Sequence, residues 1–259
     1  MIIAISPSKG QTFDHPAQVT TYTLPDYLDR SAILIDELRT MKEPDLRQLM
    51  NISEKIAALN VKRYQQFSIP FTLKNAKQAL FAFKGDVYSQ VPVDKYSKKD
   101  LAYAQNHLRI LSGLYGALRP LDLIQPYRLE MKTKLKTSSG DNLYQFWGKT
   151  ITENLNAALG SLKDPILVNL ASNEYFKAVK PKQLKGRLLT INFKEVKNGK
   201  SRVIAIFAKR ARGMMTHYLL KNRIENPEQI KQFDVGGYRF SQNDSDNNSW
   251  VFVRPQPVP

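Results

Sequence analysis

The segment Leu111–Met131 limits the fold of this chain more than any other stretch. Gly113 and Gly116 lie three residues apart, and glycine allows both positive φ and close approach of a neighbouring backbone. Pro120 ends any helix that begins after Gly116, because proline lacks the N–H that continues a helix. Any second helix after the Gly113–Gly116 turn is therefore short.

Charged residues of both signs lie in the same segment. Arg119 and Arg128 carry planar guanidinium groups that suit phosphate or carboxylate. Asp122 and Glu130 lie close in sequence, and we expect them to form ion pairs with Arg119 and Arg128, respectively, with acid–base work of their own as the alternative. A buried core does not need this mixture. Together with Phe83-Lys-Gly-Asp-Val-Tyr88, the segment therefore indicates a binding or catalytic surface.

The chain is strongly basic. It carries 39 Lys and Arg against 23 Asp and Glu, a formal net charge of +16. Such an excess attracts polyanions, of which nucleic acid is the commonest. DNA is therefore the expected partner, and a merely solubilising surface of lysines is the alternative.

The residue types available exclude several kinds of site. The chain has no cysteine, which excludes disulfides, thiolate catalysis and cysteine-based zinc or iron–sulfur sites. The histidines, His15, His107 and His217, lie far apart, so a histidine-rich metal site is not expected. A carboxylate site for Mg²⁺ stays open, but we predict no metal and no cofactor.

No membrane association is expected. The longest apolar runs are shorter than a transmembrane helix requires, and the N-terminus lacks the basic region of a signal peptide. The sequence therefore predicts a cytoplasmic protein, and it leaves the oligomeric state open.

Strand and helix patterns alternate without a regular βαβ order, which predicts an α+β fold with a mixed sheet and surrounding helices. No repeat or low-complexity linker appears, so we expect a compact single domain over residues 1–259. Asn198-Gly199 predicts a type I′ hairpin between strands over 188–196 and 202–208. Ser97 and Asp100 predict a capping box that opens a helix over 97–111. The other expected elements are strands over 2–5, 165–170, 238–241 and 250–253, and helices over 25–41, 172–179 and 209–223, with further helices from 53, 141 and 226.

Polar clusters follow three of the expected strands. A strand that leads into a helix points N–H groups outward, and these favour anions. If the three ends gather on one side of the sheet, they frame a basic pocket with Glu174 as a general base. Taken singly, each residue is better explained as a helix cap or a solvated charge, and only the recurrence after three strands makes a shared site an equal alternative. The clusters are Ser6, Ser8 and Lys9; Asn169, Ser172, Glu174, Tyr175 and Lys177; and Lys209, Arg210, Arg212 and Gly213.

The helix over 97–111, the turn Ser-Gly-Leu-Tyr-Gly and the residues from Ala117 resemble a helix-hairpin-helix element. In that element, backbone N–H groups of the hairpin bind phosphates without reading bases. Gly113 and Gly116 would supply this contact, and Tyr115 would stack on a base. The alternative is a glycine-rich turn packed under the core.

The whole chain resembles the YaaA family of peroxide-stress proteins. The motifs that carry the resemblance are Ile5-Ser-Pro-Ser-Lys9, Phe83–Tyr88, Leu111–Gly116 through Arg119-Pro-Leu-Asp122, Pro126-Tyr-Arg-Leu-Glu-Met131, Asn169-Leu-Ala-Ser172 with Glu174-Tyr175, and Ala208-Lys with Ala211-Arg-Gly-Met214. Ser8 and Gly10 stand where Ala and Thr are expected in the family, which weakens a chemical role for these two positions.

The resemblance implies a cytoplasmic protein that helps cells survive hydrogen peroxide, with lower free iron and less iron-driven damage to DNA and protein. It also implies an α+β domain with a positively charged cleft, a helix-hairpin-helix-like element and binding to DNA. It does not fix a reaction.

Two hypotheses of function follow. In the first, the protein binds duplex or damaged DNA in a basic cleft, mainly through phosphates. In the second, an enzyme acts on a nucleic-acid base, a nucleotide or a small anionic metabolite in the same cleft, with Lys9, Asp86 and Glu174 as catalytic groups. A metabolite-binding regulator is a third, weaker reading. The expected DNA- or anion-binding residues are Lys9, Lys84, Gly113, Tyr115, Gly116, Arg119, Arg128, Asn169, Ser172, Lys209 and Arg212.

Overall fold

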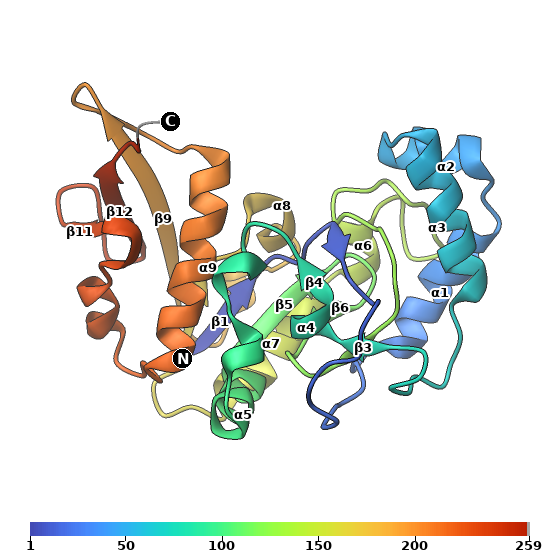
Figure 1. Ribbon diagram of the computed structural model, residues 1–259. Helices are drawn as coiled ribbons and strands as arrows, with labels where there is room; N and C mark the ends of the chain where they lie inside the picture. The colour runs from blue at the N-terminus through green and yellow to red at the C-terminus, as the bar shows by residue number, and fades with distance from the viewer. Residues whose placement is uncertain (258–259) are drawn as a thin grey trace.

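In the computed structural model, which describes residues 1–257, strand β1 (Ile2–Ile5) lies in the middle of the main sheet (Figure 1). Every residue of β1 is buried, as expected for a strand covered on both faces. Its neighbours are β5 and β8, with Ile3 opposite Leu108 on one side and Val168 on the other. The remaining strands of this sheet are β5 (Leu108–Ser112), β6 (Gly116–Leu118), β8 (Ile166–Asn169), β9 (Arg187–Lys197), β10 (Lys200–Arg202), β11 (Arg239–Ser241) and β12 (Ser249–Pro255).

The sheet is mixed. Its order is β11-β12-β9-β8-β1-β5-β6, and β10 pairs with β9 outside this path. Strands β12, β9, β8, β1 and β5 run parallel, whereas β6, β10 and β11 are antiparallel to their neighbours. This arrangement confirms the predicted α+β class with a mixed sheet. Because parallel strands end at the same edge, the loops after β1 and β8 meet there.

Helices surround the sheet, and α1, α2 and α3 stand at the opposite end of the molecule from β9, β12 and α9 (Figure 1). Helix α9 packs on β9 and on α5, while α7 packs on β1 and β6. Two small sheets pair β2 with β4 and β3 with β7. The helices are α1 (Leu28–Arg39), α2 (Glu43–Met50), α3 (Glu54–Gln66), α4 (Ala79–Ala82), α5 (Lys98–His107), α6 (Leu143–Trp147), α7 (Thr150–Gly160), α8 (Asn173–Phe176) and α9 (Ala205–Lys221), and the short strands are β2 (Gly10–Gln11), β3 (Lys77–Gln78), β4 (Phe83–Lys84) and β7 (Leu123–Ile124).

The predicted hairpin and capping box are both present. Asn198 and Gly199 have φ values of 52° and 71°, as a type I′ turn requires. Ser97 Oγ accepts a hydrogen bond from the N–H of Asp100, whose carboxylate accepts one from the N–H of Ser97.

Several predicted elements differ from the structure; the helix expected from 226, for example, is a 3₁₀ helix over Pro227–Gln232. The strand expected over 202–208 ends at Arg202, because the N–H of Ile204 donates to the buried carboxylate of Glu195 and α9 begins at the next residue. The helix expected over 97–111 ends at His107, and residues 108–112 form β5 because they pair with β1. The turn at 113–115 therefore joins two strands, β5 and β6, and no second helix follows it.

A pair of helices joined by a tight turn occurs elsewhere. Helices α2 and α3 pack against each other and are connected by Asn51, Ile52 and Ser53. Asn51 takes the left-handed conformation, with φ 50° and ψ 61°, which asparagine tolerates better than most residues. The sequence prediction missed α2.

Within residues 1–257, no helix combines the length and the apolar character that crossing a membrane requires.

Candidate anion-binding cleft

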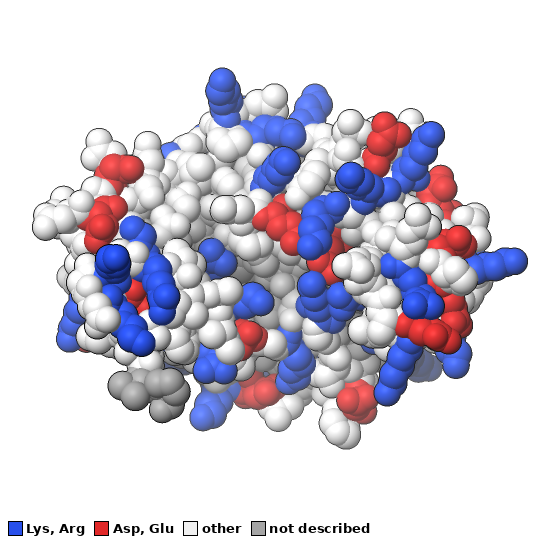
Figure 2. Space-filling view, turned by 90° about the horizontal axis from the view of Figure 1, so that it is seen from above, with Lys and Arg blue, Asp and Glu red and all other residues white. Residues whose placement is uncertain are grey.

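A cleft of about 640 Å³ opens at the edge of the sheet where β1 and β8 end. Its walls come from the loops after both strands, the turn over 85–88, the segment 130–132, and helix α9. The view from above shows a hollow near the middle of this face, with basic side chains around it and acidic ones beside it (Figure 2). Two of the three predicted strand ends meet here, those of β1 and β8, and the third predicted cluster lies on helix α9.

Hydrogen bonds between Ser6 and Ser172 join the ends of β1 and β8. The Oγ of Ser6 accepts from the N–H of Ser172 at 2.8 Å, and the two hydroxyl oxygens lie 3.2 Å apart. Tyr88 donates its hydroxyl to the carbonyl of Ser6 at 2.9 Å, which fixes the 85–88 turn against the same loop. These contacts hold three segments from distant parts of the sequence in one rigid floor.

The predicted ion pair of Glu130 is present and is part of a larger cluster. The carboxylate of Glu130 is 5% exposed and lies 3.1 Å from Arg128, 3.0 Å from Lys9 and 3.5 Å from Lys132. A single buried carboxylate thus holds three cations at the rim of the cleft.

The other carboxylates of the cleft also have partners. Asp86 lies 3.4 Å from Arg210. Glu174 is half-buried, and its Oε1 accepts a hydrogen bond from the backbone N–H of Lys132 at 3.4 Å. The three residues predicted as catalytic, Lys9, Asp86 and Glu174, all line the same cleft.

Two basic residues on α9 complete the opposite wall. Lys209 and Arg212 both line the cleft. They lie on helix α9 and not, as the sequence had predicted, at the end of a strand. Burial lowers the pKa of Arg212. Among residues 1–257, neither side chain forms an ion pair.

Two tyrosines of the cleft are held in the neutral form. Burial raises the pKa of Tyr88 well above its usual value. Burial, reinforced by the nearby Tyr127 and Glu174, raises the pKa of Tyr175 in the same way. Both hydroxyls are therefore hydrogen-bond donors at neutral pH, not bases.

The cleft continues toward the α2–α3 turn. A neighbouring cavity of about 480 Å³ shares Lys9, Glu130 and Lys132 with the cleft and is also lined by Arg128 and Lys134. Its far side is formed by Gln48–Asn51, at the end of α2. The two cavities are therefore neighbours, and basic residues lie along both of them, with Glu130 between them.

The sequence prediction missed Lys132 and Lys134, although a signal was present. Residues 131–136 alternate between buried and exposed positions, so the lysines at even positions all point to one side. Alternation of this kind is typical of extended chain.

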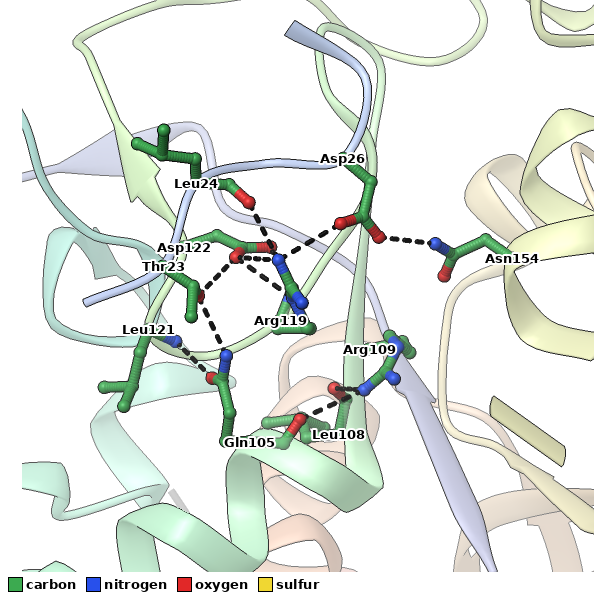
Figure 3. A network of polar contacts seen from close by, with 10 residues as sticks. All are labelled: Thr23, Leu24, Asp26, Gln105, Leu108, Arg109, Arg119, Leu121, Asp122 and Asn154. Carbon is green, nitrogen blue, oxygen red and sulfur yellow. Dashed lines mark hydrogen bonds and ion pairs between the residues drawn. The ribbon is translucent and has the colours of Figure 1, made fainter. Parts of the chain in front are cut away.

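Arg119 does not line the cleft. Figure 3 shows it in a separate network, where its Nη2 lies 3.0 Å from Asp122 and 3.1 Å from Asp26. Thr23 donates to the same Asp122 carboxylate at 2.6 Å, and Gln105 donates to Thr23. The predicted ion pair between Arg119 and Asp122 is confirmed. Because each charge already has a protein partner, this contact is structural.

The glycine turn is also structural. Gly113, Tyr115 and Gly116 are buried, so the prediction that they bind phosphates or stack on bases is wrong. Gly116 has φ 72°, and a Cβ there would lie 2.8 Å from the ring of Trp147. The turn packs under the core, which is the alternative that the sequence left open.

Two further predicted residues stand apart from the cleft lining. Asn169 is buried and accepts a hydrogen bond from the N–H of Ala171 at 3.0 Å. Lys84 is exposed on β4, next to the cleft residue Gly85. Ser172, by contrast, does line the cleft.

No cluster of three or more His, Asp or Glu side chains suited to a metal occurs in the part of the chain that the structure describes. The cleft is therefore characterised by its basic groups and their carboxylate partners.

The sequence was compared with those of known proteins. A family model described as peroxide stress protein YaaA matches residues 1–244. The chain is 56% identical over 254 residues to a UPF0246 protein of Acaryochloris marina, with 98% of this chain and 100% of the relative covered. It is 52% identical to a UPF0246 protein of Shewanella loihica, with 99% of each chain covered, and 50% identical to one of Cellvibrio japonicus, with 100% of each covered. The chain therefore belongs to the YaaA family of peroxide stress proteins.

Proposed function

We propose that this peroxide-stress protein binds DNA along the basic path from the cleft to the α2–α3 turn, in the cytoplasm, and thereby limits iron-driven oxidative damage. The observation that carries the proposal is that the two cavities are neighbours and share Lys9 and Lys132. Lysine and arginine side chains along one surface can neutralise successive backbone phosphates.

The helix pair α2–α3 supports the same proposal. Its turn lies at the end of the basic path, where short helix-to-helix turns can offer backbone N–H groups to phosphates. The net charge of +16 adds a long-range attraction for polyanions.

Protection through DNA accounts for a peroxide-stress role without an iron site. Bound protein would cover the sugar–phosphate backbone and keep iron counterions away from it. The lack of a suitable cluster of metal ligands in residues 1–257 favours this route over direct chelation.

The proposal is tested by binding of a short DNA duplex across a salt series. The affinity of the wild type should fall steeply with salt, by about 0.9 log units per log unit of salt for each phosphate neutralised. Lys132→Gln/Lys134→Gln should reduce that slope by about two units.

A matched control is Lys163→Gln/Lys185→Gln. These exposed lysines precede β8 and β9, so they lie at the opposite edge of the sheet from the cleft. They remove the same charge, and the slope should stay close to that of the wild type. Equal slopes for both double variants would reject the cleft as the DNA site.

A second candidate function is an enzyme that acts on a base, a nucleotide or a small anionic metabolite. It is favoured by the position of Glu174, which faces the cleft without a lysine or arginine side chain as ion-pair partner among residues 1–257. A general base needs this freedom. Glu174→Gln should keep DNA binding in both cases, and it should abolish turnover of a nucleotide substrate only if the enzyme reading holds.

A further inference from the structure

Arg212 is a largely buried cation without a protein partner. Its Nε is buried and forms no hydrogen bond, and its side chain makes no ion pair within residues 1–257. Burial lowers the pKa of this side chain, and no carboxylate among residues 1–257 lies within ion-pair distance of it. Arg119, Arg128 and Arg254 differ, since each lies within 3.5 Å of a carboxylate.

Two of the three carboxylates that line the cleft are committed elsewhere, and the third, Glu174, forms no ion pair with Arg212 or Lys209. Glu130 contacts Lys9, Arg128 and Lys132, and Asp86 contacts Arg210. Lys209 lies three residues before Arg212 on α9, so the two side chains share a face of the helix. This wall of the cleft is therefore positive and uncompensated.

The backbone holds Arg212 rigidly. The next residue, Gly213, packs so closely on the turn after Gly85 that a Cβ there would lie 2.1 Å from the carbonyl oxygen of Val87. The carbonyl of Arg212 accepts a hydrogen bond from Thr216 at 2.7 Å. These contacts fix where the Arg212 side chain leaves the helix, and a bound anion would offset the cost of burying its charge.

We propose that Arg212, together with Lys209, binds a phosphomonoester: the phosphate of a free nucleotide or the terminal phosphate of a DNA strand. The planar guanidinium can form two parallel hydrogen bonds to phosphate oxygens. A phosphate within a duplex carries sugars on both sides, whereas a monoester can enter a concave site end-on. It also carries nearly two negative charges at neutral pH.

That the bound phosphate belongs to a nucleotide or a DNA strand rests on the proposed function. That Arg212 lacks an ion-pair partner does not depend on it. The remaining lining of the cleft suits the rest of such a ligand. Tyr175 offers part of an aromatic ring, and Asn192, Ser8 and Asn173 offer polar groups.

The test is calorimetric titration with deoxyadenosine monophosphate, and with deoxyadenosine as the uncharged probe. The wild type should bind the monophosphate saturably and the nucleoside at least about tenfold more weakly. Arg212→Gln should weaken binding of the monophosphate by about tenfold or more. Arg239→Gln, an exposed arginine of β11 outside the cleft, removes the same charge and should leave binding unchanged.

Thermal unfolding separates a binding role from a structural one. Without ligand, Arg212→Gln should melt at or above the temperature of the wild type, because it removes a buried charge that has no partner. A melting temperature several degrees lower would overturn the proposal. If Arg212→Gln does not fold, Arg212→Lys keeps the charge without the fork, and unweakened binding of the monophosphate by that variant would also overturn it.

Duplexes with phosphate or hydroxyl ends distinguish the sources and separate the two proposals. Preference for phosphorylated ends, lost in Arg212→Gln, would support a strand end, and monophosphate binding without that preference would support a free nucleotide. If duplex binding persists equally in Arg212→Gln and no monophosphate binds, this inference fails while the proposed function stands. If the monophosphate binds through Arg212 but no duplex binds, the proposed function fails and the phosphate site stands.

Discussion

The carboxylate of Asp100 lies 2.7 Å from the Nζ of Lys221, and this ion pair joins the first turn of α5 to the last turn of α9. Ser97 also donates its hydroxyl to Asp100, at 2.8 Å. Because α9 carries Lys209 and Arg212, the contact helps to hold one wall of the cleft in place.

This ion pair should make stability depend on pH. Hydrogen bonds from Lys221 and Ser97 hold the pKa of Asp100 well below its usual range. A carboxylate with a depressed pKa contributes stability above its unfolded-state value, near 3.9, and loses it as the pH falls through the folded-state value. Asp100→Asn should therefore be less stable at neutral pH and should lose less stability in acid. Urea unfolding across the acid range checks this, and parallel curves for both proteins would contradict it.

Gly213→Ala should be strongly destabilising. The new Cβ would overlap the carbonyl oxygen of Val87, which is backbone and cannot move aside without displacing the 85–90 segment. We expect a loss of about 3 kcal/mol in the free energy of unfolding. Gly160→Ala, at the end of α7, is the control, because nothing lies within 4 Å of its Cβ position. Urea unfolding of both variants should separate them clearly.

Glu130→Gln should weaken the cluster at the rim of the cleft. Arg128 is 17% exposed and would lose its ion-pair partner, which we expect to cost about 2 kcal/mol of unfolding free energy. Glu153→Gln breaks an exposed pair with Lys149 and should change stability by less than about 0.5 kcal/mol. Equal losses of unfolding free energy in denaturant titrations of the two variants would show that the buried cluster stabilises the protein no more than an exposed ion pair does.

Arg119→Gln should destabilise the protein without changing its affinity for DNA. The variant leaves the buried carboxylate of Asp122 without its guanidinium partner, a loss of about 3 kcal/mol. Since Arg119 lies outside the cleft lining, the salt slope of duplex binding should equal that of the wild type. A reduced slope would place Arg119 among the DNA contacts after all.

The sequence predicted the parts of the site that depend on strand ends. The runs at 2–5 and 165–170 were recognised from their apolar residues, and parallel pairing then brought Ser6 and Ser172 together. The Asn198-Gly199 turn was predictable because its φ values follow from local chemistry alone.

Errors arose where tertiary pairing overrides local pattern. Residues 108–112 continue the helical pattern of α5, but they pair with β1, and the glycine turn after them became buried. Glu195 ends the strand at Arg202 through a contact with Ile204, which no local pattern reveals. The unpaired state of Arg212 likewise depends on which carboxylates lie nearby in space, and a sequence does not show this.

The position of β12 has a consequence for how the protein is made. Residues 249–255 pair in parallel with residues 190–196, so the edge of β9 stays open until the ribosome has released the later segment. Strands β1, β5 and β8, by contrast, can pair with one another while β12 is still untranslated. During synthesis the growing chain therefore exposes an unsatisfied strand edge, which makes β9 the place where nascent-chain association would begin.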